Sequence, residues 1–469
     1  MNRSRVQTIR NAKDIVNRLA IIIRICNTYS ADNEAAVRVI DSFIETVNTV
    51  LVSEKAITIE LLGEYFHIND ARVRYSVQYY LNFDFLTGEF RKRGLGSITF
   101  TDSIDRRNMQ DFIKAFLSCL SSDSPYVTFK GSLETIDSIG IGPLKQARQT
   151  NVTNKRQALR RSYFNAVLQF KKLGGNAKKS EGIEIKKARL VVNSLIDSLL
   201  QEEQMMISMT AIKDYDDYTF YHSVNVSILS LALGMKLGLN KKRLSELGIA
   251  AFLHDIGKLA VPDDILNKTT MFTDEEWETM KLHPVEGVKT VLNMMKMDQI
   301  TIRSAIVSYE HHMNFDGSGY PAIQRNAKTD FYSNIVTIAD RFDAMTSERV
   351  YSRVPKSPEE ALRILTEEAG REVDPVLLKI FIKTTGVYPI GTLVALDTRE
   401  LGIVYRGNPD LPDRPTIVLL TDSKGSEVPR TVVDLSERGI DGSYLRTVRR
   451  TLDSNKYKLD LASYLLETY

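Results

Sequence analysis

The 469-residue sequence has little of what builds disulfide frameworks or membrane spans. It has only two cysteines, Cys26 and Cys119, far apart in apolar surroundings, which indicates reduced, buried thiols. No apolar run reaches the ~18 to 20 residues that a membrane-spanning helix needs. The most apolar early stretch, residues 15–26, is interrupted by Arg18 and Arg24 and has no small-residue cleavage site after it. We therefore expect no signal peptide, no membrane span and a cytoplasmic protein.

An excess of one charge is also nearly absent, because 62 basic and 59 acidic residues leave a net charge of +3. This balance argues against nucleic acid or an anionic membrane as the main partner. The exception is the segment 145–189, which holds thirteen Lys or Arg and two Glu, with aromatic residues between them. Such composition occurs in some single-strand binders, but a solvated linker explains it with fewer assumptions.

Histidine is scarce and unevenly distributed. Of six histidines, five lie in the central third of the chain, and His67 alone lies elsewhere, where it reads as a strand-edge residue. The central histidines and one aspartate recur every 28 to 32 residues: His222, His254, His283, the pair His311-His312, and Asp340. That spacing is roughly a helix, its connection and a return. Several helices would each bring a ligand to one centre, as in helical metal-binding bundles.

The segment 252–258, FLHDIGK, organises this region. It places His254 beside Asp255, and neighbouring positions of a helix would hold two sides of one metal ion, or Asp255 would bridge two ions. Lys258 follows three positions later, so a helix would bring it to the same side, facing a ligand. For an isolated His-Asp pair, a helix surface or a core histidine would be the ordinary interpretation. The shared spacing of the other histidines favours metal binding.

The motifs around these residues resemble those of a known family. In chain order they are YHSVNVSILSLALG, AAFLHDIGKLAVPDDILNK, MKLHPVEGV, HHMNFDGSGYP and IADRFDAMTSERVYS. They are similar to the successive motifs of the HD-GYP family, metal-dependent phosphodiesterases of bacterial cyclic dinucleotides. The match runs from about residue 211 to residue 381 and includes Gly319-Tyr320-Pro321, the GYP of the family's name.

The resemblance implies a centre of two divalent metal ions, with iron or manganese favoured by imidazole and carboxylate ligands. Asp255 would bridge the ions. The remaining ligands would be His222, His254 and Asp340 for one ion, and His283, His311 and His312 for the other. Tyr218 stands where members with a third metal carry a glutamate, so we expect two ions.

The same resemblance implies which residues act on the substrate. Asp255 would be catalytic as the bridging carboxylate, and Lys258 would be catalytic as a positive charge beside the scissile phosphate. Further substrate contacts would be Tyr320, Asp343, Arg349 and Arg353. Tyr320 would stack on a base or contact a partner, while the loop 316–321 reads equally well as a structural support for the two histidines before it. The usual Glu-Arg after the histidine pair is replaced by Met313-Asn314, which would alter the surroundings of the ligands.

The patterns predict a mainly α fold with a central HD-type helical bundle, an N-terminal α+β module and a small C-terminal β appendage. The predicted divisions are the module at 1–145, a basic linker at 146–182, the catalytic helical domain at 183–385 and the appendage at 386–469. A strong amphipathic helix starts near Ile183 and is a candidate for a homodimer interface or, equally, for a helix facing the core of its own chain.

Some local signals in the central domain are specific. Thr273 and Ser357 read as helix N-caps, each with a glutamate three residues later in capping-box position. Trp277, the only tryptophan of the chain, reads as a packing residue.

The expected function is hydrolysis of cyclic di-GMP to linear pGpG, with GMP as a further product, through a hydroxide activated by two metals. A second interpretation keeps the metals and changes the substrate to another cyclic dinucleotide, such as cyclic GMP-AMP, or to a different phosphoester. A third is a receptor that binds cyclic dinucleotide without turnover. The complete ligand set argues against the receptor, because degenerate receptors usually lose ligands first.

Overall fold

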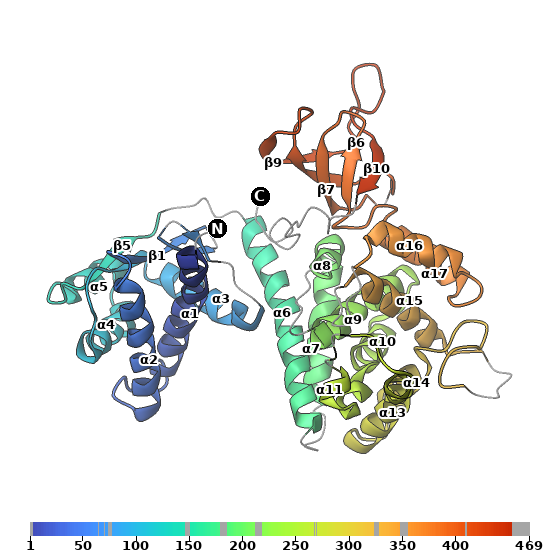
Figure 1. The fold of residues 1–469 in the computed structure, drawn as a ribbon, viewed down its shortest axis with the longest axis horizontal. Coiled ribbons are helices and arrows are strands. Elements are labelled where there is room, and N and C mark those ends of the chain that lie inside the picture. The colour runs from blue at the N-terminus through green and yellow to red at the C-terminus, as the bar shows by residue number, and fades with distance from the viewer. Residues whose placement is uncertain are drawn as a thin grey trace. The chain divides into compact units, whose positions relative to one another are not determined.

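The chain folds into two compact units, Met1–Asn151 and Val152–Tyr469, shown as a ribbon in Figure 1. The computed structural model describes these residues: 3–63, 65–69, 71–73, 77–145, 151–178, 185–211, 218–266, 268, 270–322, 328–347, 355–408 and 410–452. The fold is mainly α, with an N-terminal α+β module, a central helical bundle and a C-terminal β-sheet, which confirms the predicted fold class. None of the helices in the described ranges combines the length and apolarity that crossing a membrane requires.

The first unit combines helices with a five-stranded antiparallel sheet of order β3-β2-β1-β4-β5. Its helices are α1 (Arg3–Cys26), α2 (Glu34–Leu51), α3 (Val77–Lys92), α4 (Arg106–Ser118), the 3₁₀ helix η1 (Cys119–Ser121) and α5 (Pro125–Ser132). Its strands are β1 (Ile57–Leu62), β2 (Tyr65–Ile68), β3 (Ala71–Arg72), β4 (Leu95–Phe100) and β5 (Ile139–Pro143). Asn33 caps α2 by accepting from the Ala35 N–H, and the apolar residues of α2 recur every three or four positions on its buried side. Cys26 and Cys119 are both buried free thiols.

The second unit holds the helical bundle. Its helices are α6 (Asn151–Lys178), α7 (Ile185–Gln201), α8 (Glu203–Met209), α9 (Tyr218–Lys236), α10 (Lys241–Leu253), η2 (Ile256–Ala260), α11 (Asp263–Leu266), α12 (Asp274–Met280), α13 (His283–Met294), α14 (Gln299–Glu310), α15 (Phe331–Thr346), α16 (Pro358–Glu367) and α17 (Pro375–Thr385). α9 packs against α7, α8, α10, α15 and α17. It is buried along nearly its whole described length, as a helix surrounded by others must be.

The capping signals are borne out to different degrees. At α12, Thr273 accepts from the Glu276 N–H and the Glu276 carboxylate accepts from the Thr273 N–H, which is the complete predicted capping box. At α16, Ser357 accepts from the Glu360 N–H, but the Glu360 carboxylate pairs with Lys356 instead of returning to the cap. The second box is therefore only half formed.

The basic segment is more ordered than a solvated linker. Much of it forms α6, which buries Tyr163, Phe164 and Phe170. These are the aromatic residues that gave the segment the look of a single-strand binder, and in the described structure they belong to the core. The amphipathic helix predicted near Ile183 is α7, which begins at Ile185, while Ile183 itself lies outside the described ranges. Its apolar side packs on α9 and α10 of its own chain.

The second unit ends in a five-stranded antiparallel sheet of order β10-β6-β7-β8-β9. Its strands are β6 (Leu393–Leu396), β7 (Leu401–Arg406), β8 (Thr416–Thr421), β9 (Glu427–Asp434) and β10 (Val448–Leu452). Hydrogen bonds between described residues join the sheet to the bundle. The Gly407 N–H donates to Gln204 Oε1 at 3.2 Å, and Thr451 Oγ1 donates to Glu359 Oε2 at 3.1 Å.

Candidate metal centre

Seven candidate ligands lie on, or directly after, five helices of the second unit and meet at one place. They are His222 on α9, His254 and Asp255 after α10, His283 at the start of α13, His311 and His312 after α14, and Asp340 on α15. Six of them are buried, and His312 keeps a quarter of its side chain exposed. Residues spread over more than a hundred positions of the sequence thus share one centre.

The backbone at the His-Asp pair differs from the expected continuous helix. α10 ends at Leu253, His254 is its C-cap, and Asp255 has φ −99° and ψ 11°, outside the α-helical region. The 3₁₀ helix η2 follows, with the Lys258 N–H donating to the Asp255 carbonyl. The prediction that this segment is one helix is wrong, because the chain tightens by changing to i, i+3 hydrogen bonding.

Two glycines allow the elements that carry ligands to come close together. A Cβ on Gly257 would overlap the His283 carbonyl oxygen and the Gly287 nitrogen, and a Cβ on Gly287 would overlap Ser308 Oγ. η2 therefore packs directly on the first turn of α13, and α13 packs on α14. Larger residues at either position would push His283 away from the centre.

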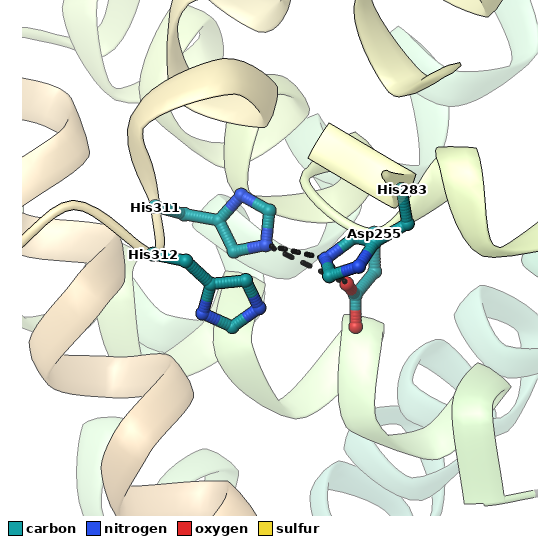
Figure 2. A group of neighbouring side chains, drawn as sticks. All are labelled: Asp255, His283, His311 and His312. Atoms are coloured by element: carbon teal, nitrogen blue, oxygen red, sulfur yellow. Dashed lines mark hydrogen bonds and ion pairs between the residues drawn. The ribbon is translucent and has the colours of Figure 1, made fainter. Parts of the chain in front are cut away.

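The carboxylate of Asp255 lies between two groups of ligand atoms. One group is Asp255 with His283, His311 and His312, and the other is Asp255 with His222 and His254, each with ligand atoms within 4.8 Å of one another. Figure 2 shows the three imidazole rings of the first group gathered at the Asp255 carboxylate. His283 Nε2 is 3.3 Å from Asp255 Oδ1, and His254 Nε2 is 3.3 Å from Asp255 Oδ2. Asp255 is the one residue common to both groups.

Main-chain oxygens decide which nitrogen of each ring faces the centre. Nδ1 of His254 lies 2.7 Å from the Ala251 carbonyl, Nδ1 of His283 lies 2.7 Å from the Met280 carbonyl, and Nδ1 of His311 lies 2.8 Å from the Ser308 carbonyl. A carbonyl oxygen only accepts, so each Nδ1 carries the proton and donates it. Each Nε2 is thereby turned towards the centre, where it can coordinate a cation.

The second group is completed by Asp340. His222 Nε2 lies 2.9 Å from Asp340 Oδ1 and 3.5 Å from Asp255 Oδ2. Burial by itself raises the pKa of Asp340, but hydrogen bonding to His222 outweighs it and holds the pKa well below its ordinary value. Burial lowers the pKa of His222, and its hydrogen bonds to Asp340 and Asp343 outweigh that effect, so its pKa is raised.

Asp343 lies behind His222 rather than at the substrate. His222 Nδ1 donates to Asp343 Oδ2 at 2.8 Å, and Asn225 Nδ2 donates to Asp343 Oδ1 at 3.0 Å. Its side chain is only 1% exposed, so it cannot reach a ligand that enters from solvent. These contacts do not support the prediction that Asp343 contacts substrate. Its position is that of a residue that orients a ligand ring and increases its basicity.

A buried chain of hydrogen bonds continues from Asp343 to α6. Tyr163 Oη donates to Asn225 Oδ1 at 2.8 Å, and Asn225 Nδ2 also donates to the Thr210 carbonyl at 3.2 Å. Burial, with the nearby charge of Asp343, raises the pKa of Tyr163 well above its ordinary value, so the phenol keeps its proton. The sequence reasoning missed Asn225. The sequence feature that could have identified Asn225 is its position three residues after His222, which places both on the same side of a helix.

Lys258 forms an ion pair with the carboxylate at the middle of the centre. Its Nζ is 2.6 Å from Asp255 Oδ2, and its side chain is 19% exposed. Burial raises the pKa of Asp255, but the charge of Lys258 and contacts with His254 outweigh it, so this pKa lies well below its ordinary value. Burial lowers the pKa of His283 to about 3, against the attraction of Asp255. At neutral pH the carboxylate is therefore charged and the His283 ring is neutral.

The loop with the GYP sequence closes over His312. The Tyr320 N–H donates to the His312 carbonyl at 3.2 Å, and Gly319, at φ 94°, approaches that oxygen so closely that a Cβ would overlap it. Asn314, one of the two departures from the usual Glu-Arg, accepts from Arg341 Nη2 at 2.8 Å. The Tyr320 ring lies 4.7 Å from the His312 ring. The loop is thus both a support for the histidine pair and a wall beside it.

Three predicted features lie outside what the structure describes. Arg349 and Arg353, the predicted phosphate contacts, fall among residues 348–354, which the described ranges omit. Tyr218 begins α9, but its side chain is likewise outside the description.

The candidate ligands fit a metal centre because two of their buried polar atoms lack a hydrogen-bond partner among the described residues. His254 Nε2 and Asp255 Oδ1 are buried and have no hydrogen-bond partner in the described structure. Leaving two such atoms buried without a partner costs free energy that a bound cation would recover. Imidazole nitrogens and carboxylates without thiolate are ligands that divalent transition metals accept.

Comparisons with known proteins cover both the bundle and the sheet. A family model described as HD domain matches residues 193–377, and one described as KOW domain associated with HD domain matches residues 393–439. The cyclic di-GMP phosphodiesterase PA4108 of Pseudomonas aeruginosa is 32% identical over 302 residues, covering 64% of this chain and 70% of the relative. The chain belongs to the HD-GYP family. The HD pair of this family member is His254-Asp255, and its GYP sequence is Gly319-Tyr320-Pro321.

A second relative matches over a shorter part of its own length. The 3′3′-cGAMP-specific phosphodiesterase 1 of Vibrio cholerae is 32% identical over 40% of this chain and 43% of its own. Among solved structures, the HD-GYP protein Bd1817 from Bdellovibrio bacteriovorus aligns with 70% of this chain and 93% of its own, at a TM-score of 0.41 and 15% identity.

Proposed function

We propose that this HD-GYP protein is a metal-dependent phosphodiesterase that hydrolyses cyclic di-GMP to linear pGpG, with GMP as a further product. The observation that carries the proposal is the carboxylate of Asp255 placed between two groups of imidazoles. A two-metal site needs a ligand of that kind, since it must hold both ions about 3.5 to 4 Å apart. The relatives named as cyclic di-GMP phosphodiesterases support the choice of substrate.

The proposed centre holds two divalent ions, iron or manganese. One would be held by His222, His254, Asp255 and Asp340, the other by Asp255, His283, His311 and His312. When bound, such a pair supplies a nucleophilic hydroxide at neutral pH and neutralises charge on the phosphoryl oxygens.

The chain's own residues prepare this chemistry in three ways. The main-chain carbonyls around His254, His283 and His311 accept from Nδ1 of each ring and so keep each Nε2 pointed inward. Asp255 stays ionised because Lys258 and His254 lower its pKa. The ammonium of Lys258, within 2.6 Å of that carboxylate, is placed to hold a phosphate oxygen and to offset the charge that develops on it.

A second candidate substrate is cyclic GMP-AMP, since the Vibrio cholerae relative is named for it. The two substrates share the sugar-phosphate ring and differ in one base, so the metal centre treats them alike.

The proposal also includes a cytoplasmic location and a homodimer through α7. The apolar side of α7 is occupied within its own chain, so a dimer would use its outer residues, such as Leu190, which is 70% exposed.

The proposal is tested with protein loaded with Fe²⁺ or Mn²⁺ and incubated separately with cyclic di-GMP and with cyclic GMP-AMP, followed by chromatography of the products. We expect pGpG from cyclic di-GMP. Asp255→Asn, which keeps the shape and removes the bridging charge, should abolish turnover with an unchanged circular dichroism spectrum. His67→Ala, which removes the one histidine outside the centre, should keep wild-type activity. Saturable binding of either dinucleotide without any product would identify a receptor and overturn the enzymatic proposal.

A further inference from the structure

A row of aromatic rings leads away from the open side of the metal centre. His312 is the most exposed candidate ligand, with 25% of its side chain accessible, whereas none of the other six exceeds 6%. The Tyr320 ring lies over His312, with centroids 4.7 Å apart and 35° between the planes. Beyond it, the Trp277 ring meets Tyr320 edge to face at 6.2 Å. The row therefore begins where solvent, and hence substrate, reaches the centre.

Trp277 is unusually exposed for a packing residue. In the structure without ligand, 43% of it is accessible to water, although tryptophan is highly buried on average. The Phe272 ring stacks on it at 6.1 Å with only 23° between the planes. Trp277 thus has an aromatic neighbour behind it and another at its edge, and still keeps a large accessible area.

The backbone that carries Trp277 is firmly held. The capping box of Thr273 and Glu276 begins α12, and the Trp277 N–H donates to the Thr273 carbonyl at 2.9 Å. Lys268 forms an additional ion pair with the Glu276 carboxylate. An exposed ring on a fixed backbone loses little conformational entropy on binding, which is a property of binding platforms.

We propose that Trp277, backed by Phe272, is a stacking subsite for one base of the bound cyclic dinucleotide. This inference rests on the proposed function. A phosphate at the metal centre leaves two flat purine bases projecting from the sugar-phosphate ring, and aromatic side chains are the usual partners of unpaired bases. Stacking accepts any base because every base has a π-face. Trp277 binds substrate and takes no part in the chemistry.

The connection between Trp277 and the metal centre indicates which molecule binds at Trp277. Tyr320 links Trp277 to His312 and also lies 6.3 Å from the His283 ring, so a molecule that covers Trp277 can touch the ligands as well. A dinucleotide on the metal ions satisfies both contacts. A partner protein docking on Trp277 would show as binding that requires no dinucleotide.

Fluorescence gives a direct test, because Trp277 is the only tryptophan and its emission reports on this position alone. The hydrolysis-resistant phosphorothioate analogue of cyclic di-GMP is titrated into the metal-loaded protein. Stacking of a guanine on the indole should quench the emission in a saturable way. Saturable binding of the analogue by calorimetry with no change in emission would overturn the subsite.

Kinetics provide an independent test through Trp277→Ala, Trp277→Phe and the control Phe331→Ala, which removes another exposed ring, at the start of α15. Loss of one base stack should raise KM about 5- to 150-fold. kcat should stay within about twofold, because stacking is the same in the ground state and in the transition state. Trp277→Phe should restore most of the affinity, and Phe331→Ala should behave as wild type.

The outcomes separate this inference from the proposed function. If the wild-type protein does not hydrolyse cyclic dinucleotides, the proposed function fails and the subsite fails with it. If the wild type hydrolyses them and folded Trp277→Ala has an unchanged KM, the subsite alone is wrong and Trp277 is a packing residue. If Trp277→Ala does not fold, Trp277→Phe and the fluorescence titration decide.

Discussion

His283 Nε2 lies 3.2 Å from His311 Nε2, within hydrogen-bond distance. Each ring donates its proton through Nδ1 to a main-chain carbonyl, at Met280 and at Ser308. Two Nε2 atoms therefore face each other in a buried site, next to the Asp255 carboxylate. A divalent cation could be coordinated by both nitrogens and by the carboxylate, so the arrangement fits a bound ion.

We expect two metal ions per chain, with one of them dependent on the pair His283 and His311. Each ion would have its own histidines and would share only Asp255 with the other. His283→Ala should therefore reduce the content from about two ions to about one, as measured by elemental analysis of fully loaded protein. His67→Ala should leave it unchanged. A wild-type content of one or three ions would contradict the ligand assignment.

Asp343→Asn should weaken the ion on the His222 side by about 10- to 100-fold in affinity, the usual effect of removing a residue that orients a metal ligand. The carboxylate accepts from His222 on one oxygen and from Asn225 on the other. An amide has only one oxygen, so it must leave one donor unpaired.

The effect of Asp343→Asn is measured by competition with a metal chelator, and Asp197→Asn, at an exposed ion pair on α7, is the matched control. The ion on the His283 side should bind as in the wild type. Equal weakening of both ions would mean that Asp343 supports the fold in general rather than His222.

The sequence predicted which residues gather at the centre better than it predicted their roles. A repeat of one ligand in about every thirty residues follows from the length of a helix and its return, so the set could be read from spacing and motif order. Asp340 and Asp343 are one turn apart on α15 and both are buried. Periodicity shows that both face inward, but only the packing of α15 against α9 decides that one faces the centre and the other the back of His222.

The backbone geometry around His254 and Asp255 could not be predicted from the sequence either. Only Gly257 in FLHDIGK disfavours a helix, yet the chain leaves the α-helix already after Leu253, and Gly257 is needed because α13 comes so close. The basic residues of α6 also obscured its apolar side, where Tyr163 reaches the hydrogen bonds behind His222. These features depend on contacts between distant segments, which composition does not report.

The last prediction separates Lys258 from the ligands. Its Nζ, 2.6 Å from Asp255 Oδ2, belongs to a side chain that is 19% exposed, so it lies at the edge of the centre rather than within it. Lysine is positively charged at neutral pH and does not bind a cation, but it can hold a phosphate oxygen as charge develops there. Lys258→Ala should therefore keep both metal ions by elemental analysis. Loss of such a contact typically costs ~2.7 to 4 kcal/mol, or ~100- to 1,000-fold in turnover.

The same variant should still bind the phosphorothioate analogue of cyclic di-GMP, because the interaction of Lys258 strengthens mainly in the transition state. Lys281→Ala removes another lysine in an i, i+3 ion pair, with Glu278 on α12, and it should leave turnover unchanged. If Lys258→Ala loses an ion, the ion pair with Asp255 supports the structure of the site. If it hydrolyses cyclic di-GMP at the wild-type rate, Lys258 has no part in the reaction, and the charge on the phosphate is offset by other groups.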